Sequence, residues 1–149
     1  MNRLTFVQLY AEDKENCATF EQLMWQYNKE LDEHQSRIIP IDFIEKWIKI
    51  IIQIQGDNDR HLELCYDDKT LIGFLYGKIV RPEHNGFIKV GYGYIMEFFV
   101  LPEHRRNGYG KEMFLHLEKL FKQDGAKRMY LTSASITGNP FWESLGFVN

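Results

Sequence analysis

Long apolar runs are missing from this chain of 149 residues, and none approaches the roughly 18 residues that a membrane-spanning helix requires. The opening segment, MNRLTFVQLYAEDKEN, also lacks the apolar core of a secretory signal peptide. These two absences predict a chain that resides in the cytoplasm and has no membrane partner.

Cysteine is scarce, and positive charge is not in excess. Cys17 and Cys65 are the only cysteines, too few for a disulfide framework and in no metal-ligand spacing. The five histidines show no ligand spacing either, and His116 is expected to face solvent. We therefore expect no metal site. A net charge of −3 disfavours a general role in nucleic-acid binding, so no nucleic-acid partner is expected.

The composition that remains is ordinary for a soluble globular protein, with 44% hydrophobic and 26% charged residues. The length predicts one domain, residues 1–149, with room for a proper core. The sequence contains no internal repeat, low-complexity tract or linker that would divide this domain.

Hydrophobic periodicity predicts a mixed α/β domain around one sheet. Residues 48–54 alternate like a strand, but the length of their segment and its start at Pro40 favour a helix. Gly91 and Gly93 interrupt a long strand pattern, where a β-bulge could sit. The expected elements are a strand at 4–10, a helix from 13, a helix at 41–55, strands at 61–66, 70–80 and 87–101, a helix at 108–124, a strand at 128–134 and a short helix at 140–145.

Turn signals punctuate this order. The Asp-Asp-Lys of residues 67–69 is a plausible hairpin turn between two strands. Gly125 suits the C-terminal cap of the helix at 108–124, and Gly146 follows the last helix.

The stretch that leads into the helix at 108–124 combines cations with glycines. Arg105 and Arg106 precede Gly108 and Gly110. The first turn of a helix has free N–H groups and a partial positive charge, and glycine lets a ligand approach that backbone closely. The loop is therefore either a phosphate or pyrophosphate site, or only a tight strand-to-helix turn with solvated arginines.

Two common phosphate motifs do not match this loop. A Walker loop requires a glycine where Arg105 stands, and a serine or threonine after Lys111, where the chain has Glu112. A dinucleotide fingerprint requires a third glycine where Met113 stands. The sequence therefore favours neither a nucleoside-triphosphate loop nor a dinucleotide fold.

Residues 105–110, Arg-Arg-Asn-Gly-Tyr-Gly, match the (Gln/Arg)-x-x-Gly-x-(Gly/Ala) loop of the GNAT superfamily of N-acetyltransferases. As in that family, the loop follows a strand that ends in Val-x-Pro, at residues 100–102. Residues 141–147, Phe-Trp-Glu-Ser-Leu-Gly-Phe, resemble the family's final-helix pattern Phe-Tyr-x-x-x-Gly-Phe. The resemblance covers essentially the whole chain, and residues 97–110 look most similar to the polyamine and diamine acetyltransferases.

The resemblance implies a site for acetyl-coenzyme A. In that family the N–H groups of residues 106–110 would hold the pyrophosphate, and the pantetheine arm would lie beside residues 98–100 like an extra strand. A backbone N–H near Phe99 would polarise the acetyl carbonyl. The residues expected at this coenzyme site are Phe98, Phe99, Val100, Arg105, Arg106, Asn107, Gly108, Tyr109, Gly110, Lys111, Ser135 and Trp142.

Glu97 is the expected catalytic residue. It sits in residues 94–100, a run that is apolar on both faces and therefore typical of a doubly covered central strand. A carboxylate there is costly unless it is paired or hydrogen-bonded. With a raised pKa it could take the proton that an amine must lose before attack. The alternative is a structural ion pair with a neighbouring Lys or Arg.

The tyrosine that serves as general acid in many family members is missing from this chain. Where they have a tyrosine that protonates the departing thiolate, this chain has Trp142, and an indole is no usable acid near neutral pH. The family's frequent asparagine is Ser135 here, and Gly138 replaces a frequent small residue. Ser133, Ser135, Tyr130 and solvent are the candidate proton donors.

The expected function is transfer of acetyl from acetyl-coenzyme A to a primary amine of a small molecule by direct attack. Trp142 favours a rival, a coenzyme-binding or regulatory module with weak or no catalysis. Acetylation of a protein N-terminus or lysine is a second rival.

The resemblance also bears on association. The family usually has one or two strands after the final helix, and only Val148 and Asn149 follow residues 146–147. The expected GNAT-like fold therefore lacks its final strand, which leaves the strand at 128–133 with an exposed apolar edge. We expect either a homodimer that covers this edge, with help from residues 48–54, or a truncated sequence. The alternative is a monomer whose first helices cover the edge.

Overall fold

The computed structural model describes residues 3–33, 40–55, 59–82, 89–131 and 139–147. The order of helices and strands in these residues confirms the order predicted from periodicity. The elements are β1 (Leu4–Gln8), α1 (Lys14–Glu33), α2 (Ile41–Gln53), β2 (Arg60–Asp67), β3 (Thr70–Ile79), β4 (Gly93–Val100), the 3-10 turn η1 (Pro102–His104), α3 (Tyr109–Gln123), β5 (Met129–Leu131) and α4 (Asn139–Ser144).

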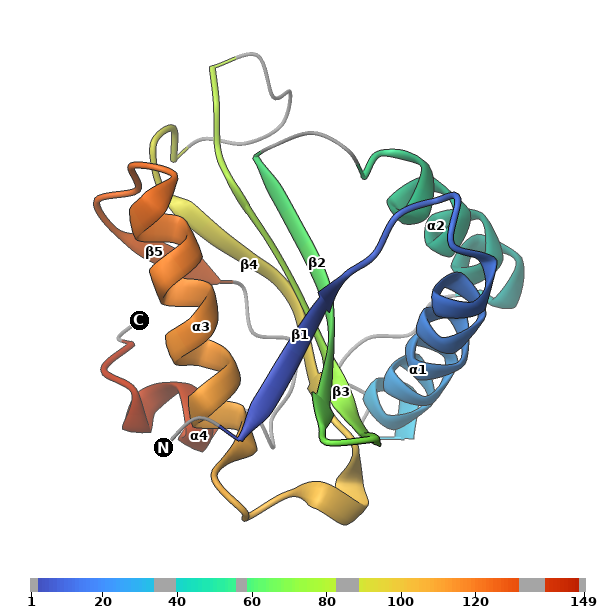
Figure 1. The fold of residues 1–149 in the computed structure, drawn as a ribbon. Helices are drawn as coiled ribbons and strands as arrows, with labels where there is room; N and C mark the ends of the chain where they lie inside the picture. Colours follow the sequence, from blue (N-terminus) through green and yellow to red (C-terminus); the bar gives the residue numbers. More distant parts are fainter. Residues whose placement is uncertain (1–2, 34–39, 56–58, 83–88, 132–138, 148–149) are drawn as a thin grey trace.

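One mixed sheet runs through the molecule in the order β1-β2-β3-β4-β5. The first three pairings are antiparallel, and β5 joins β4 in parallel. Helices α1 and α2 cover one face of the sheet, and α3 and α4 cover the other (Figure 1). The fold is therefore the expected mixed α+β arrangement, with an apolar core on each side of the sheet.

The segment after Pro40 is a helix, as its length predicted. Ile44, Ile48 and Ile51 recur every three or four residues and are buried against the sheet. Ile50 and Ile54 lie on the outside and are exposed. The strand-like alternation of isoleucines therefore reflects apolar residues on two sides of one helix.

The prediction for Gly91 and Gly93 was wrong. Strand β4 begins at Gly93, and Gly91 instead adopts φ 86° in a turn where its N–H donates to the carbonyl of Val80 at 2.8 Å. At Gly93 a Cβ would lie 2.4 Å from the ring of Phe121, so glycine is needed there for close packing with α3. These glycines serve a turn and a close approach rather than a bulge.

The bulge lies three residues further along β4. Tyr76 of β3 pairs with Glu97, whereas the next residue, Gly77, pairs with Ile95. Met96 is therefore the extra residue, and the strand bends beside Glu97. The antiparallel β2–β3 ladder ends at the predicted hairpin turn, where Asp68 has φ 54°.

Strand β5 is short in the described part of the chain. Met129, Tyr130 and Leu131 pair with Gly93, Tyr94 and Ile95, and the rest of the predicted strand at 128–134 lies partly in residues 132–138, outside the described residues. No helix among the described residues is long and apolar enough to cross a membrane.

Candidate active site

The loop at the mouth of α3 has the backbone of an anion site. Gly108 is the N-terminal cap of α3, with φ 82°, and no side chain caps the helix there. Within the described part of the chain, the first-turn N–H groups therefore donate no hydrogen bond to a capping side chain. Arg106 also has positive φ, 66°, which is rare for a residue with a side chain and turns the backbone at the loop. This geometry fits a pyrophosphate held by backbone N–H groups.

Contacts from the N-terminal strand and a hairpin hold this loop in place. A guanidinium nitrogen of Arg3 donates to the carbonyl of Asn107 at 2.7 Å, and the same group lies 4.3 Å from the centre of the Tyr109 ring. The hydroxyl of Tyr109 donates to Asp67 at 2.6 Å, and this hydrogen bond is the largest cause of the raised pKa of Tyr109. The loop is therefore anchored from two directions.

Arg105 is hydrogen-bonded within the protein, whereas the sequence suggested an arginine that is either solvated or bound to phosphate. Its two terminal nitrogens donate to the two carboxylate oxygens of Glu30 on α1, both at 2.6 Å. Its Nε donates to the carbonyl of Val100 at 2.9 Å. Arg106 and Lys111 are exposed and are the cations at the mouth that remain open to a ligand from solvent.

Helix α4 packs against the same mouth. A Cβ at Gly110 would lie 3.0 Å from the ring of Phe141, so this glycine permits the close approach of α4. The rings of Phe141 and Trp142 also contact Phe98 of β4, with centroids 5.9 and 5.0 Å away. The predicted coenzyme residues Phe98, Gly110 and Trp142 therefore meet on one side of the sheet, whereas Phe99 is buried in the core on the other side.

One edge of β4 is open in the described part of the chain. The strand pairs with β3 along its length, but its described pairing with β5 covers only Gly93, Tyr94 and Ile95. For residues 98–100, no strand other than β3 is a partner among the described residues. This edge leads from the bulge to the loop and fits an extended chain that pairs with it as a strand would.

Glu97 lies in a buried polar environment on the α1 and α2 side of the sheet. Its side chain is 6% exposed, and it pairs across the strands with Tyr76, so the two share a face. Burial raises the pKa of Tyr76, and the negative charge of Glu97 adds to that rise. Arg60 donates to the Tyr76 hydroxyl at 2.9 Å, and the buried Lys78 lies two residues along the same strand and face.

Trp142 lies across the sheet from Glu97. Besides Phe98 it packs edge-on against Phe114 and Phe147, with centroids 6.3 and 5.6 Å away. The indole therefore sits in an aromatic cluster with α3. Of the other candidate proton donors, Tyr130 stacks on Tyr94 with ring centroids 4.4 Å apart. Ser133 and Ser135 lie outside the described residues.

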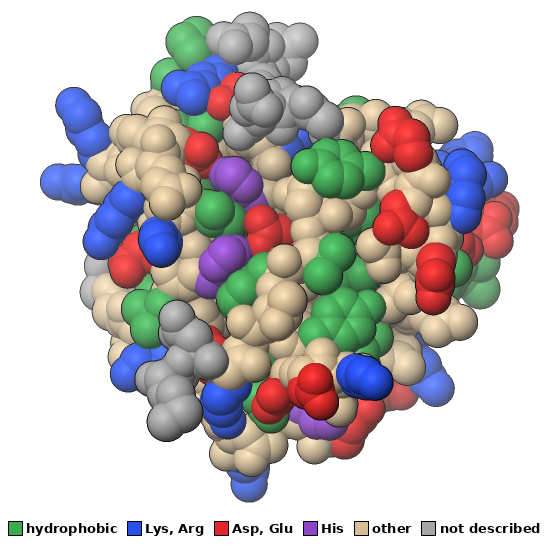
Figure 2. Space-filling view, in the orientation of Figure 1, with side chains coloured by type: hydrophobic (Ala, Val, Ile, Leu, Met, Phe, Trp, Pro, Cys, Tyr) green, Lys and Arg blue, Asp and Glu red, His purple; other side chains and the backbone are tan. Residues whose placement is uncertain are grey.

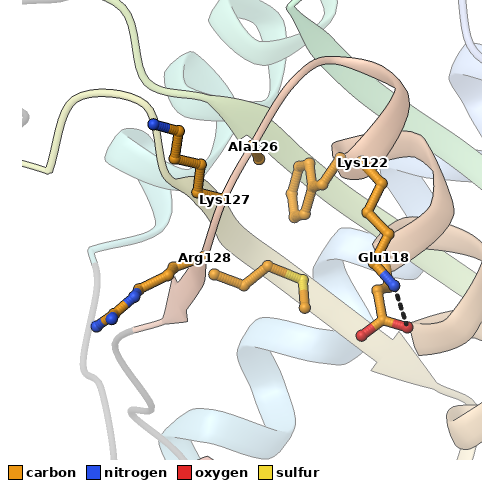
Figure 3. A pocket seen from close by; sticks show the side chains of 7 residues that line it. Glu118, Lys122, Ala126, Lys127 and Arg128 are labelled. Atoms are coloured by element: carbon orange, nitrogen blue, oxygen red, sulfur yellow. Dashed lines mark ion pairs between the residues drawn. The ribbon is translucent and has the colours of Figure 1, made fainter.

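A small hollow lies at the far end of α3 from the loop (Figure 3). Its volume is about 40 Å³, enough for little more than a water molecule. Lys122 and Glu118, four residues apart on α3, form an ion pair of 3.8 Å at its rim. The lining residues are Glu118, Phe121, Lys122, Ala126, Lys127, Arg128 and Met129.

Two histidine–carboxylate pairs were missed by the sequence analysis. The Nε2 of His61 lies 2.6 Å from a carboxylate oxygen of Asp124, and the Nε2 of His116 lies 2.6 Å from one of Glu63. The ring of His116 also stacks on Phe6 at 3.6 Å, so the expectation that it only faces solvent was wrong. Figure 2 shows histidine beside acidic side chains on the face that it views. Among the described residues, no group of three or more His, Cys, Asp or Glu side chains could hold a metal ion.

Comparisons with known proteins agree with this geometry. The model of the "Acetyltransferase (GNAT) family" matches residues 17–147. A spermidine N(1)-acetyltransferase of Thermoplasma acidophilum is 24% identical over 94% of this chain and 85% of its own length.

Solved structures resemble the fold over nearly the whole chain. A predicted acetyltransferase of Clostridium acetobutylicum with acetyl-CoA has a TM-score of 0.75 and 17% identity, covering 98% of this chain and 90% of its own. The PaiA N-acetyltransferase of T. acidophilum in complex with coenzyme A has a TM-score of 0.63 and 22% identity, covering 97% and 89%. Because the family model matches most of its length and the fold agrees, the chain belongs to the GNAT family of acetyltransferases.

Proposed function

We propose that this protein transfers the acetyl group of acetyl-coenzyme A to a primary amine of a small molecule. One observation carries the proposal: β4 bears a buried carboxylate, Glu97, beside its bulge, and the same strand then leads to a glycine-capped helix mouth at Gly108 whose geometry fits an anion. A general base and a coenzyme cradle on one strand are what acetyl transfer to an amine requires. The relatedness to a spermidine acetyltransferase supports an amine as acceptor.

The coenzyme is assigned to the side of the sheet covered by α3 and α4. The N–H groups of residues 106–110 would hold the pyrophosphate, with Arg106 and Lys111 adding charge from the rim. Residues 98–100 would bind the pantetheine arm along the open edge of β4, and Phe98 and Trp142 would pack against it. The coenzyme, when bound, supplies an acetyl group activated as a thioester.

Glu97 is assigned as the base. A primary alkylamine is protonated near neutral pH and cannot attack until it loses a proton. A buried carboxylate can accept that proton, directly or through one water molecule. The Met96 bulge bends β4 next to Glu97, so a backbone N–H near Phe99 is proposed as the donor that polarises the acetyl carbonyl. The amine then attacks directly, without an acetylated residue.

No dedicated acid is assigned for the departing thiolate. Trp142 cannot serve as one, and burial raises the pKa of Tyr130, which makes this phenol a weaker acid. A thiol has a pKa near 8.5, so its release as thiolate is tolerable without an acid. Solvent or Ser135 is the proposed proton source, and the assignment of Ser135 to the coenzyme site stays a prediction.

Release of free thiol from acetyl-coenzyme A tests the proposal. The purified full chain is incubated with a panel of amines, amino acids and a lysine peptide, and the acetylated product is identified by mass spectrometry. Small amines are expected to be acetylated. Tight coenzyme binding with no turnover on any acceptor would instead support the rival, a coenzyme-binding module. Acetylation of the peptide alone would support the protein-modifying rival.

Partners and compartment stay predictions. A cytoplasmic location and the homodimer are not tested by the fold. The exposed Phe43 and Ile50 of α2 and Ile54 at its C-terminal cap provide apolar surface of the kind expected for self-association, although Ile48 and Ile51 are used in the core. Light scattering at micromolar concentration decides the point, because a clean species of 17.8 kDa would refute the dimer.

A further inference from the structure

Three tyrosines gather where β4 and β5 run side by side. The rings of Tyr94 and Tyr130 stack in parallel, 4.4 Å apart and 2° from coplanar. The ring of Tyr92 meets Tyr130 edge-on at 6.0 Å. All three side chains are half-buried, so the cluster keeps part of its aromatic surface open to solvent. We call these three residues the tyrosine shelf.

The shelf lies on the same face of the sheet as Glu97, and the bulge is the reason. In a regular strand, Tyr94 and Glu97 would point to opposite faces, because they are three residues apart. Tyr94 pairs with Lys78 and Glu97 pairs with Tyr76, and residues 76 and 78 of β3 share a face. The extra residue Met96 therefore brings the shelf onto the face of the proposed base.

The shelf already attracts an ammonium group. The Nζ of Lys89 lies 5.3 Å from the centre of the Tyr92 ring and 5.7 Å from that of Tyr130. Both distances are within the roughly 6 Å at which the negative face of an aromatic ring attracts a cation. Lys89 is itself exposed, so its ammonium can leave the rings for water at little cost. It occupies a place that a ligand ammonium could take.

We propose that the tyrosine shelf binds a second cationic group of the amine acceptor, in competition with the ammonium of Lys89. This inference rests on the proposed function, since it takes Glu97 to mark the reacting amine. Tyr92 lies opposite Val80 and Glu97 lies opposite Tyr76, so the two positions are four β3 residues apart, about 13 Å along the sheet. The acceptor class is therefore a long α,ω-diamine or a polyamine, whose terminal amino groups can span such a distance.

The charges nearby specify which part of the shelf the ligand uses. The buried Lys78 pairs with Tyr94, so it opposes a second ammonium at that end. The ligand ammonium therefore binds at the other end, over Tyr92 and Tyr130, where Lys89 now lies. The alternative is an acceptor with an anionic group that binds to Lys89. Removing Lys89 would weaken the binding of such an acceptor, whereas it should strengthen the binding of a cationic one.

The test compares 1,8-diaminooctane with 1-aminooctane, which differ only in the second amino group. We expect wild-type kcat/KM to be higher for the diamine. Tyr92→Leu and Tyr130→Leu should lower kcat/KM for the diamine by about 2- to 30-fold and leave the monoamine nearly unchanged, since a cation–π contact is lost. Tyr92→Phe and Tyr130→Phe keep the ring face and are the matched controls. Coenzyme affinity and thermal melting report whether each variant is folded.

The Lys89→Gln variant tests whether Lys89 competes with the second ammonium of the acceptor. Removing the competing ammonium should lower KM for the diamine and leave the monoamine unchanged. A higher KM for the diamine, or equal losses on both amines in the leucine variants, would overturn the shelf. Equal wild-type kcat/KM for the two amines would also overturn the shelf while leaving the proposed function intact. If neither amine is acetylated, calorimetry with 1,8-diaminooctane and the coenzyme-bound protein decides: no binding overturns the shelf, and the missing turnover counts separately against the proposed function.

Discussion

Arg105 and Glu30 form a bidentate ion pair, with both nitrogen–oxygen distances at 2.6 Å. Together with the bond from Arg105 Nε to the Val100 carbonyl, it ties the loop after β4 to helix α1. Arg105 is thus bound on all three guanidinium nitrogens. Its contribution to coenzyme binding would then be to hold the loop in shape, and the formal charge for phosphate would come from Arg106 and Lys111.

Arg105→Ala is expected to weaken coenzyme A binding by about 1–3 kcal/mol, because it removes charge-assisted hydrogen bonds that hold the loop. Isothermal calorimetry with the purified chain measures this loss. Gly108→Asp is the companion variant: φ 82° disfavours a side chain there, and a carboxylate at the helix mouth would repel phosphate. Unchanged affinity in both variants would remove the coenzyme from this loop.

The Glu30→Gln variant tests whether Arg105 holds the loop in shape or binds phosphate directly. If Arg105 braces the loop, Glu30→Gln weakens coenzyme binding in the same direction as Arg105→Ala, and the double variant costs less than the sum of the two. We expect this result. The pair is partly exposed, so its effect on the stability of the fold should be at most about 1 kcal/mol. Tighter coenzyme binding by Glu30→Gln would mean that the freed guanidinium binds phosphate itself.

Glu97→Gln is expected to lower turnover by roughly 10²–10⁴-fold, the contribution of a general base in the transition state. Coenzyme affinity should change little, because Glu97 lies on the face opposite Phe98 and Trp142, the side on which the coenzyme is proposed to bind. Turnover of the variant should recover as pH rises, since free amine then becomes abundant without a base. Turnover within a few-fold of wild type at saturating amine would make Glu97 a structural residue.

The order of the elements could be predicted because each one carries its own pattern. Helix α2 is an example: its start at Pro40 and its length outweighed the alternation of isoleucines, and Ile44, Ile48 and Ile51 are indeed its buried face. The loop at Gly108 was also found from local chemistry, because glycine at a helix mouth has few other uses. Such features depend on neighbours in the sequence.

The features that were missed depend on neighbours in space. Nothing local distinguishes Met96 as the bulge residue, since the register between β3 and β4 decides it. His116 pairs with Glu63 from another element, 53 residues away in sequence, so helical periodicity alone assigned it to solvent. The engagement of Arg105 by Glu30 spans 75 residues and could not be read from the motif.

Gly73→Ala is expected to destabilise the fold by about 3 kcal/mol, at the upper end of the usual cost of overpacking. A Cβ at Gly73 would lie 1.9 Å from the carbonyl oxygen of Phe99, and a backbone atom inside a sheet cannot move aside easily. Urea unfolding measures the loss. Thr70→Ala, at an exposed position of the same strand, is the control and should change stability by about 0.5 kcal/mol or less. Equal stability of the two variants would show that β3 and β4 can separate at this point.

Trp142→Tyr tests whether the missing phenol limits the enzyme. Tyrosine fits sterically because it is smaller, and the ring can keep its edge-on contact with Phe98. Some packing against Phe114 and Phe147 would be lost, so we expect a stability cost of about 1–2 kcal/mol. Turnover should be unchanged or higher, because a phenol next to the open edge of β4 can donate a proton to the departing thiolate, which an indole cannot. Trp142→Phe restores no acid and is the matched control for the lost volume. If turnover falls equally in both variants while coenzyme affinity holds, the indole itself shapes the site, and the release of thiolate needs no acid.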